Sequence, residues 1–337
     1  MTEMDRRTFL ARSVVAVGAV SAAVLVGEQV VKRRRGQPWD GAAFAPPGDA
    51  RVAVLRATSY DGDLEGVVGE GLRAIGADVR GARVVLKPNL VEFNRSTAIN
   101  TDPRLVGAAV VALRRLGAAD IVVGEGPGHR RDTQYVVTSS GLLEALDAVD
   151  ARFVDLNTDA VTRVPLHSRY TALGDLWLPR TIADADIVVS MPKMKTHHWA
   201  GVTLSLKNCF GCVPGRVYGW PKNVLHWAGI DQAILDVAGA VRPDYAIVDG
   251  IVGMEGNGPI SGTPIASGVL VFGDDPVATD VVSARVMGFD PEKIMYLAEA
   301  GRFLGQGAMD RIRIDGEDPS AVTTDFAVLP QFDAMKA

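Results

Sequence analysis

Short runs rich in β-branched residues alternate with longer amphipathic segments from residue 51 onward, and this alternation constrains the fold more than any other feature. Eight of the short runs are predicted strands: 51–57, 83–87, 120–124, 152–156, 186–190, 244–248, 268–272 and 311–314. Strands that alternate with helices are typical of βα units around a mainly parallel sheet. The sequence therefore predicts a doubly wound α/β fold with helices on both faces of the sheet.

The amphipathic segments supply the predicted helices: 63–76, 103–116, 140–149, 229–240, 276–287 and 291–301. Three of them begin at Asp102-Pro103, Asp275-Pro276 and Asp290-Pro291. An aspartate cap followed by proline at the first helical position is a common helix start. The order of the elements predicts a first lobe at 51–185, a second lobe at 186–320 and a tail at 321–337.

Polar residues follow several of the predicted strands directly. Lys87 and Asn89 follow one hydrophobic run, Glu125 ends another, and Lys193 and Asp249 follow two more. In parallel sheets these positions lie at the carboxyl edge, where helix N-termini and loop amides converge on ligands. The pattern predicts one shared site at this edge.

A cation-rich segment at 191–227 adds further lysines, three histidines and three tryptophans. The chain has a net charge of −5, and residues 36–337 hold 28 basic against 37 acidic residues, so nothing indicates nucleic-acid binding. A cluster of cations in an acidic protein predicts a pocket for a small carboxylate or phosphate. We expect the anion to be held by four lysines and oriented by two asparagines: Lys87, Lys193, Lys195 and Lys207, with Asn89 and Asn208.

Proton transfer and metal binding have their own candidates. We expect His197 to act as a general acid or base with Glu125 or Asp249. Cys209 and Cys212, the chain's two cysteines, have the spacing of a redox or metal pair, although the sequence favours a buried pair without such a role. The residues expected to hold a divalent ion are Cys209, Cys212, Glu255 and Asp280.

Three functions therefore stay open. The first is an enzyme that acts on an anionic small molecule or cofactor. The second is a redox or metal protein that uses Cys209 and Cys212. The third is a non-catalytic ligand-binding protein of the cell envelope.

The first residues are typical of an export leader. Arg6-Arg7 precedes Phe9-Leu10, and residues 13–27 form an uncharged apolar run that is short for a membrane span. We expect residues 1–35 to be a twin-arginine leader or an N-terminal membrane anchor, and 36–50 to be a linker. The predicted partner is the twin-arginine export machinery, and the predicted location is the periplasm or cell envelope.

Several motifs also resemble a known family. Lys87-Pro88-Asn89 and the segments 191–197, 203–208, 255–259, 276–280 and 287–291 resemble family 362 of the domains of unknown function, over nearly all of 51–301. Many members look like iron–sulfur proteins because they carry an added ferredoxin segment with clustered cysteines. This chain lacks that segment, so no cluster is expected within it. The resemblance implies the position of the site and no established reaction.

Overall fold

A computed structural model describes residues 37–129 and 132–337. The leader predicted at 1–35 lies outside the described residues. Within them, one ten-stranded sheet dominates. Its main path runs in the order β12 (Ile312–Gly316), β1 (Ala50–Arg56), β11 (Thr263–Gly273), β10 (Tyr245–Glu255), β7 (Ile187–Met191), β2 (Arg83–Pro88), β3 (Asp120–Glu125) and β4 (Arg152–Asp155).

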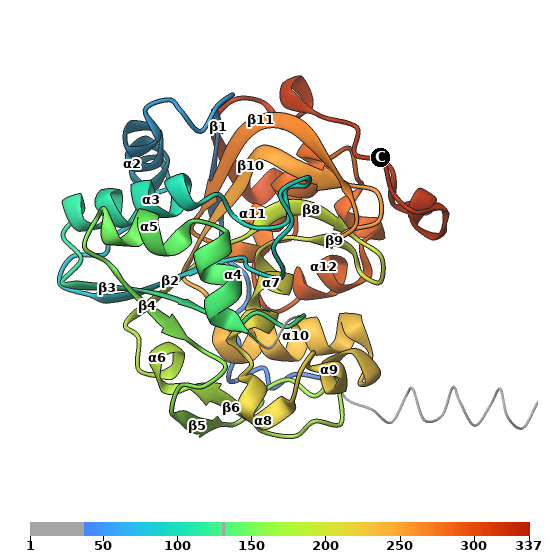
Figure 1. The fold of residues 1–337 in the computed structure, drawn as a ribbon. Helices are drawn as coiled ribbons and strands as arrows, with labels where there is room; N and C mark the ends of the chain where they lie inside the picture. Colours follow the sequence, from blue (N-terminus) through green and yellow to red (C-terminus); the bar gives the residue numbers. More distant parts are fainter. Residues whose placement is uncertain (1–36, 130–131) are drawn as a thin grey trace, which may run out of the picture.

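Most neighbouring strands on this path are parallel. β11 is antiparallel to both β1 and β10, and with β10 it forms a long curved hairpin (Figure 1). β8 (Lys193–His197) pairs in parallel with β10, and β9 (Gly201–Thr203) pairs antiparallel with β8. The predicted mainly parallel α/β fold is confirmed.

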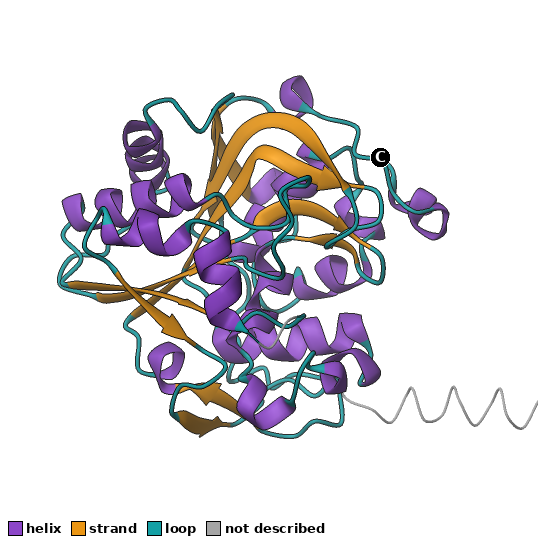
Figure 2. Cartoon of the chain, in the orientation of Figure 1, coloured by secondary structure: helices purple, strands orange, loops and turns teal. Residues whose placement is uncertain are grey.

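Helices cover both faces of the sheet (Figure 2). One face carries α2 (Leu64–Ala74), α3 (Pro103–Arg115), α4 (Thr133–Ser139) and α5 (Leu142–Asp147). The other carries α7 (Ser205–Asn208), α10 (Ile230–Val241), α11 (Pro276–Val286) and α12 (Met295–Ala300). Smaller elements are α6 (Arg180–Ala183), α8 (Gly215–Tyr218), α9 (Asn223–Trp227) and the two-stranded sheet of β5 (Val161–Val164) and β6 (Leu176–Pro179).

The alternation of side chains along the strands produces two hydrophobic cores. On β2, Val84 and Leu86 pack in the core beneath α2 and α3, whereas Val85 packs in the core beneath α10 and α11. Successive side chains of a strand point to opposite faces of a sheet, so one short run serves both cores. This double burial explains why the predicted strands are almost wholly apolar.

The sheet runs across the predicted boundary between residues 185 and 186. β2 of the predicted first lobe pairs with β7 of the second, and β1 pairs with β11 and β12. The division into two lobes stays a prediction, and the strands of both predicted lobes build one sheet.

The segments predicted as linker and tail pack against the body. Phe44 is buried, and the ring of Trp39 stacks on Phe303 with centroids 4.8 Å apart. Phe326 of the tail is also buried. None of the helices in residues 37–129 and 132–337 is long and apolar enough to cross a membrane.

Candidate functional site

A buried ion pair joins the ends of two neighbouring strands. Lys87 lies near the end of β2 and Glu125 ends β3, and their side chains meet at 2.6 Å between Nζ and Oε2. Both side chains are 1% exposed. Parallel strands end at the same edge of a sheet, so two polar residues far apart in the sequence become neighbours, as the sequence predicted.

The carboxylate of Glu125 is held on both oxygens. Its Oε2 also accepts from the backbone N–H of Leu90 at 3.1 Å, and its Oε1 accepts from Gly126 N–H at 2.8 Å. A Cβ atom added to Gly211 would overlap Oε1, so only glycine permits this close approach. The buried charge is therefore paired and fully hydrogen-bonded, as buried charges must be to be tolerated.

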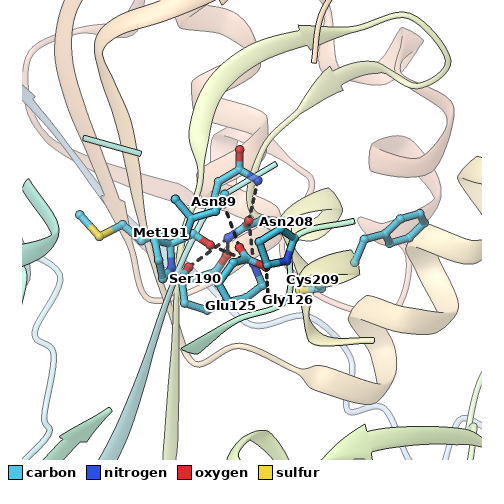
Figure 3. Close-up of polar contacts among 12 residues, drawn as sticks. Asn89, Glu125, Gly126, Ser190, Met191, Asn208 and Cys209 are labelled. Atoms are coloured by element: carbon cyan, nitrogen blue, oxygen red, sulfur yellow. Dashed lines mark hydrogen bonds and ion pairs between the residues drawn. The ribbon is translucent and has the colours of Figure 1, made fainter. Parts of the chain in front are cut away.

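Asn208 on α7 fixes the orientation of Asn89. Its Nδ2 donates to the carbonyl of Lys87 and to Ser190 Oγ, both at 3.1 Å, so its Oδ1 must be the acceptor for Lys87 Nζ at 3.0 Å. The same Oδ1 accepts from Asn89 Nδ2 at 3.1 Å (Figure 3). Asn89 consequently turns its Oδ1 away from Asn208, and this buried oxygen has no hydrogen-bond partner among the described residues.

Lys193 and Asp249 form a second buried pair that is closed on itself. Lys193 Nζ lies 2.6 Å from Asp249 Oδ2 and also donates to Tyr60 OH and to the carbonyl of Val252. Tyr60 OH donates to Asp249 Oδ1 at 2.7 Å, and burial together with Asp249 raises the pKa of Tyr60. The backbone N–H of Asp102 also donates a hydrogen bond to Asp249 Oδ2. Lys193 was predicted to bind the ligand and Asp249 to transfer protons. In the structure the two side chains form an ion pair with each other.

A cavity of about 790 Å³ opens beside the first pair. Its walls come from the residues after β2 and β3, from β8 and β9, from the segment between α7 and α9, and from the loop 257–261. This volume is typical of a small-molecule site. The cavity brings together six of the predicted site residues: Asn89, Glu125, Lys195, His197, Lys207 and Asn208.

Three buried lysines line this cavity. Lys195 Nζ donates to the carbonyl of Ile99 at 2.7 Å, and Lys222 Nζ donates to the carbonyl of Gly126 at 2.6 Å. Lys207 Nζ lies 3.8 Å from the centroid of the Phe210 ring and makes no hydrogen bond or ion pair within the described part of the chain. All three side chains are at most 9% exposed, so their charges are poorly solvated.

The pKa values of these lysines reflect that burial. Burial, and then the charges of Lys87 and Lys222, lower the pKa of Lys207 to about 7. Burial lowers the pKa of Lys222 to about 8 although Glu125 opposes the shift. Burial and the nearby lysines also lower the pKa of Lys195. Among the described residues, Glu125 is the one carboxylate lining the cavity, and Lys87 already neutralises it.

His197 lines the same cavity and carries one hydrogen-bond donor on its ring. Its Nδ1 accepts from the backbone N–H groups of Trp199 and Ala200 at 3.0 and 3.2 Å, so the neutral ring carries its proton on Nε2. Burial, followed by the charge of Lys207, lowers the pKa of His197. His198 stacks on it with ring centroids 5.0 Å apart. The neutral imidazole of His197 is thereby fixed in one tautomer.

The residues predicted as metal ligands are not gathered into one ligand set. Cys209 Sγ donates to the carbonyl of Ser205 at 3.5 Å, and burial raises the pKa of both cysteines, that of Cys212 to about 12. Asp280 accepts from the N–H groups of Ser205 and Leu206, and Glu255 accepts from Ala327 N–H. No group of three or more His, Cys, Asp or Glu side chains in residues 37–129 and 132–337 could hold a metal ion.

Sequence reasoning missed part of the cavity wall. Lys222, His226, Phe210 and Thr203 all line it, and none was among the predicted site residues. Lys222 lay within the cation-rich segment, so its charge was a usable signal. Burial, followed by the charge of Lys207, lowers the pKa of His226 to about 4. The Phe210 ring lies between these two side chains, with Lys207 Nζ 3.8 Å from its centroid and the His226 ring centroid 5.8 Å from it.

Comparison with known proteins identifies the family. The model of a domain of unknown function, DUF362, matches residues 84–285, which include both buried ion pairs and all of the lysines described above. The chain belongs to the DUF362 family.

A curated relative supports this assignment. The chain is 33% identical over 269 residues to a thylakoid-associated protein of Synechocystis sp., and the match covers 74% of this chain and 78% of the relative. That name places the relative at a membrane system. It says nothing of a reaction.

Two solved structures are similar at 12% sequence identity. The lactate racemase apoprotein of Thermoanaerobacterium thermosaccharolyticum gives a TM-score of 0.46 over 74% of this chain and 58% of that one. A Thermotoga maritima protein gives a TM-score of 0.33 over 59% of this chain and 52% of that one. The DUF362 chain thus spans little more than half of each structure.

Proposed function

We propose that this DUF362 protein is an enzyme that binds an anionic small molecule, a carboxylate or a phosphate, in the cavity beside Lys87 and Glu125. The observation that carries the proposal is the excess of buried positive charge, since Lys195, Lys207 and Lys222 line the cavity without a carboxylate of their own. A buried charge is costly unless it is paired. A bound anion would supply the missing counter-charge.

The roles of the residues follow from their free hydrogen-bonding groups. Lys207 has no other hydrogen-bond partner in the described structure, so it is assigned the closest contact with the anion. Lys195 and Lys222 each donate to backbone carbonyls and add charge at the walls. His197, with its proton on Nε2, is assigned a hydrogen bond from this N–H to the bound molecule.

Replacing Lys207 by methionine is expected to weaken the binding of inorganic phosphate by about tenfold or more, because a charge-assisted contact is lost. The variant should be at least as stable as the wild type, since it no longer buries an unpaired ammonium group. Titration calorimetry measures the first effect and urea unfolding the second. Native mass spectrometry of both proteins, freshly purified, would show whether an anion co-purifies with the wild type alone.

The matched control is Lys293→Met, because Lys293 is half exposed and lies outside the cavity. It should leave phosphate binding unchanged. Equal phosphate affinity in the wild type and Lys207→Met would overturn the proposal.

Anion binding is also expected to depend on pH. In the free protein Lys207 and Lys222, with pKa values of about 7 and about 8, are partly neutral between these two values. A bound anion favours the ammonium form and raises both pKa values, so binding takes up protons. The affinity for sulfate, whose own charge is constant in this range, should therefore be highest below pH 7 and fall as the pH rises through 7 and 8.

Calorimetry in two buffers of different ionisation enthalpy measures the proton uptake directly. The expected loss of affinity is at most about tenfold per pH unit for each lysine. An affinity that stays constant from about pH 6 to about pH 9 would contradict the assignment of these lysines.

We further propose that the protein is exported through the twin-arginine machinery and works in the periplasm or cell envelope. Arg6-Arg7 and the apolar run after it support this location, as does the name of the thylakoid-associated relative. Export machinery of this kind reads the arginine pair itself. Changing Arg6 and Arg7 together to lysine should leave the protein in the cytoplasmic fraction, whereas Arg12→Lys should not. An unchanged distribution would count against export.

A further inference from the structure

Asn89 lines the cavity, and its Oδ1 is a buried hydrogen-bond acceptor whose orientation is fixed. Asn208 can present only its own oxygen to Asn89, because its nitrogen is engaged by the carbonyl of Lys87 and by Ser190 Oγ. Asn89 must therefore donate from Nδ2 to Asn208 Oδ1, at 3.1 Å, and its own Oδ1 is left without a donor among the described residues. Flipping the amide of Asn89 would set two oxygens against each other, so the orientation follows from the network.

The side chain of Asn89 is 7% exposed, and no protein group among the described residues donates to its oxygen. A buried acceptor left without a donor is destabilising. Thr203 also lines the cavity, and its buried Oγ1 has no hydrogen-bond partner among the described residues. A donor from a bound molecule that packs against these two residues would complete their hydrogen bonding.

Asn89 Oδ1 cannot accept a hydrogen bond from a deprotonated oxygen of the anionic group. An amide oxygen and a deprotonated carboxylate or phosphate oxygen are both acceptors, and Oδ1 has no proton to share. The positive charge available to the anionic group comes from Lys195, Lys207 and Lys222. A neighbouring group of the ligand must therefore be the donor to Asn89.

We infer that the ligand of this cavity carries a hydroxyl or amino group beside its anionic group, and that this group donates a hydrogen bond to Asn89 Oδ1. The inference rests on the proposed anion binding and narrows it to hydroxy- or amino-substituted carboxylates and phosphates. Asn89 then determines specificity, because an analogue without the donor leaves a buried acceptor unpaired.

The test compares probes that differ by hydroxyl groups. L-malate is compared with succinate, and glycerol 3-phosphate with propyl phosphate, by titration calorimetry on the full chain. The wild type should prefer the hydroxylated member of at least one pair by about tenfold to a hundredfold, which corresponds to one unsatisfied buried acceptor. Asn89→Leu should bind both members equally.

Two further variants keep the result interpretable. Asn89→Asp keeps an acceptor but places its second oxygen against Asn208 Oδ1, so it should lose stability and bind all four probes more weakly, while its preference ratio persists. Asn223→Leu removes another cavity-lining amide, at the start of α9, and should keep the wild-type ratio. Unfolding curves for each variant establish that the comparison is between folded proteins.

Equal affinities within both pairs in the wild type, or a preference that survives in Asn89→Leu, would overturn the inference. Failure of all four probes to bind would overturn it as well. The wild type could also bind succinate or propyl phosphate without any preference for the hydroxylated probes, and lose this binding in Lys207→Met. That result would contradict this inference and still support the proposed anion binding.

Discussion

Replacing Asp249 by asparagine is expected to destabilise the protein by about 3–5 kcal/mol, the cost of leaving a buried charge without its partner. Lys193 lies 2.6 Å from this carboxylate, and the two side chains are 2% and 0% exposed. Asparagine has nearly the same shape, so the packing is retained while the ammonium group of Lys193 stays buried and unpaired. Urea unfolding monitored by circular dichroism measures the loss.

Two comparisons separate a structural role of this pair from a catalytic one. The double variant Lys193→Met with Asp249→Leu should recover most of the lost stability, because replacing a whole buried pair by apolar residues is often neutral. Lys207→Met, which removes an unpaired lysine, should lose none. If Asp249→Asn unfolds at the same urea concentration as the wild type, the pair does not stabilise the fold. Asp249 would then again be a candidate for proton transfer, as predicted from the sequence.

The parts of the fold encoded locally were predictable from the sequence. Asp102 and Asp275 each accept a hydrogen bond from the backbone N–H of the second residue after them, as their Asp-Pro pattern predicts for a helix start. Asp290 caps only the 3-10 turn Pro291–Lys293, and the helix predicted at 291–301 begins at Met295 as α12. All eight predicted strands are present within a few residues of their predicted ends, although β10 and β11 run further. Hydrophobic periodicity and capping depend on residues close together in the chain, so a single sequence is enough to predict these strands and helix starts.

The separation of Lys193 from Lys195 could not be predicted. Two residues apart on β8, they should share one side of the strand. In the structure Lys193 pairs in register with Asp249 of β10, while Lys195 pairs with Met254, so the register shifts between them. Lys193 therefore contacts Asp249 and Lys195 reaches the cavity. Register shifts depend on tertiary packing, and no local pattern in the sequence encodes this one.

The site around Glu125 depends equally on a contact that the sequence does not reveal. Gly211 lies in the short 3-10 turn at Cys209–Cys212, far along the chain from Glu125 and Lys87. It brings this turn against the buried pair, because an added Cβ would overlap Glu125 Oε1 and lie 2.6 Å from Lys87 Nζ. The spacing of Cys209 and Cys212 suggested redox or metal chemistry. The geometry indicates that the glycine between them is the constrained residue of this turn.

Gly211→Ala is accordingly expected to destabilise the protein by about 3–5 kcal/mol and to abolish phosphate binding. Glu125 cannot swing aside without leaving Lys87, Leu90 N–H and Gly126 N–H, so the added methyl group must break the buried pair or displace the turn. Urea unfolding and phosphate calorimetry measure the two effects.

Gly128→Ala is the matched control, since Gly128 also lines the cavity but its added Cβ would meet nothing closer than 3.9 Å. That control should cost less than about 0.5 kcal/mol. A Gly211→Ala protein with wild-type stability and phosphate affinity would show that the turn can move away from Glu125, and that the close contact of Gly211 with the buried pair is not required.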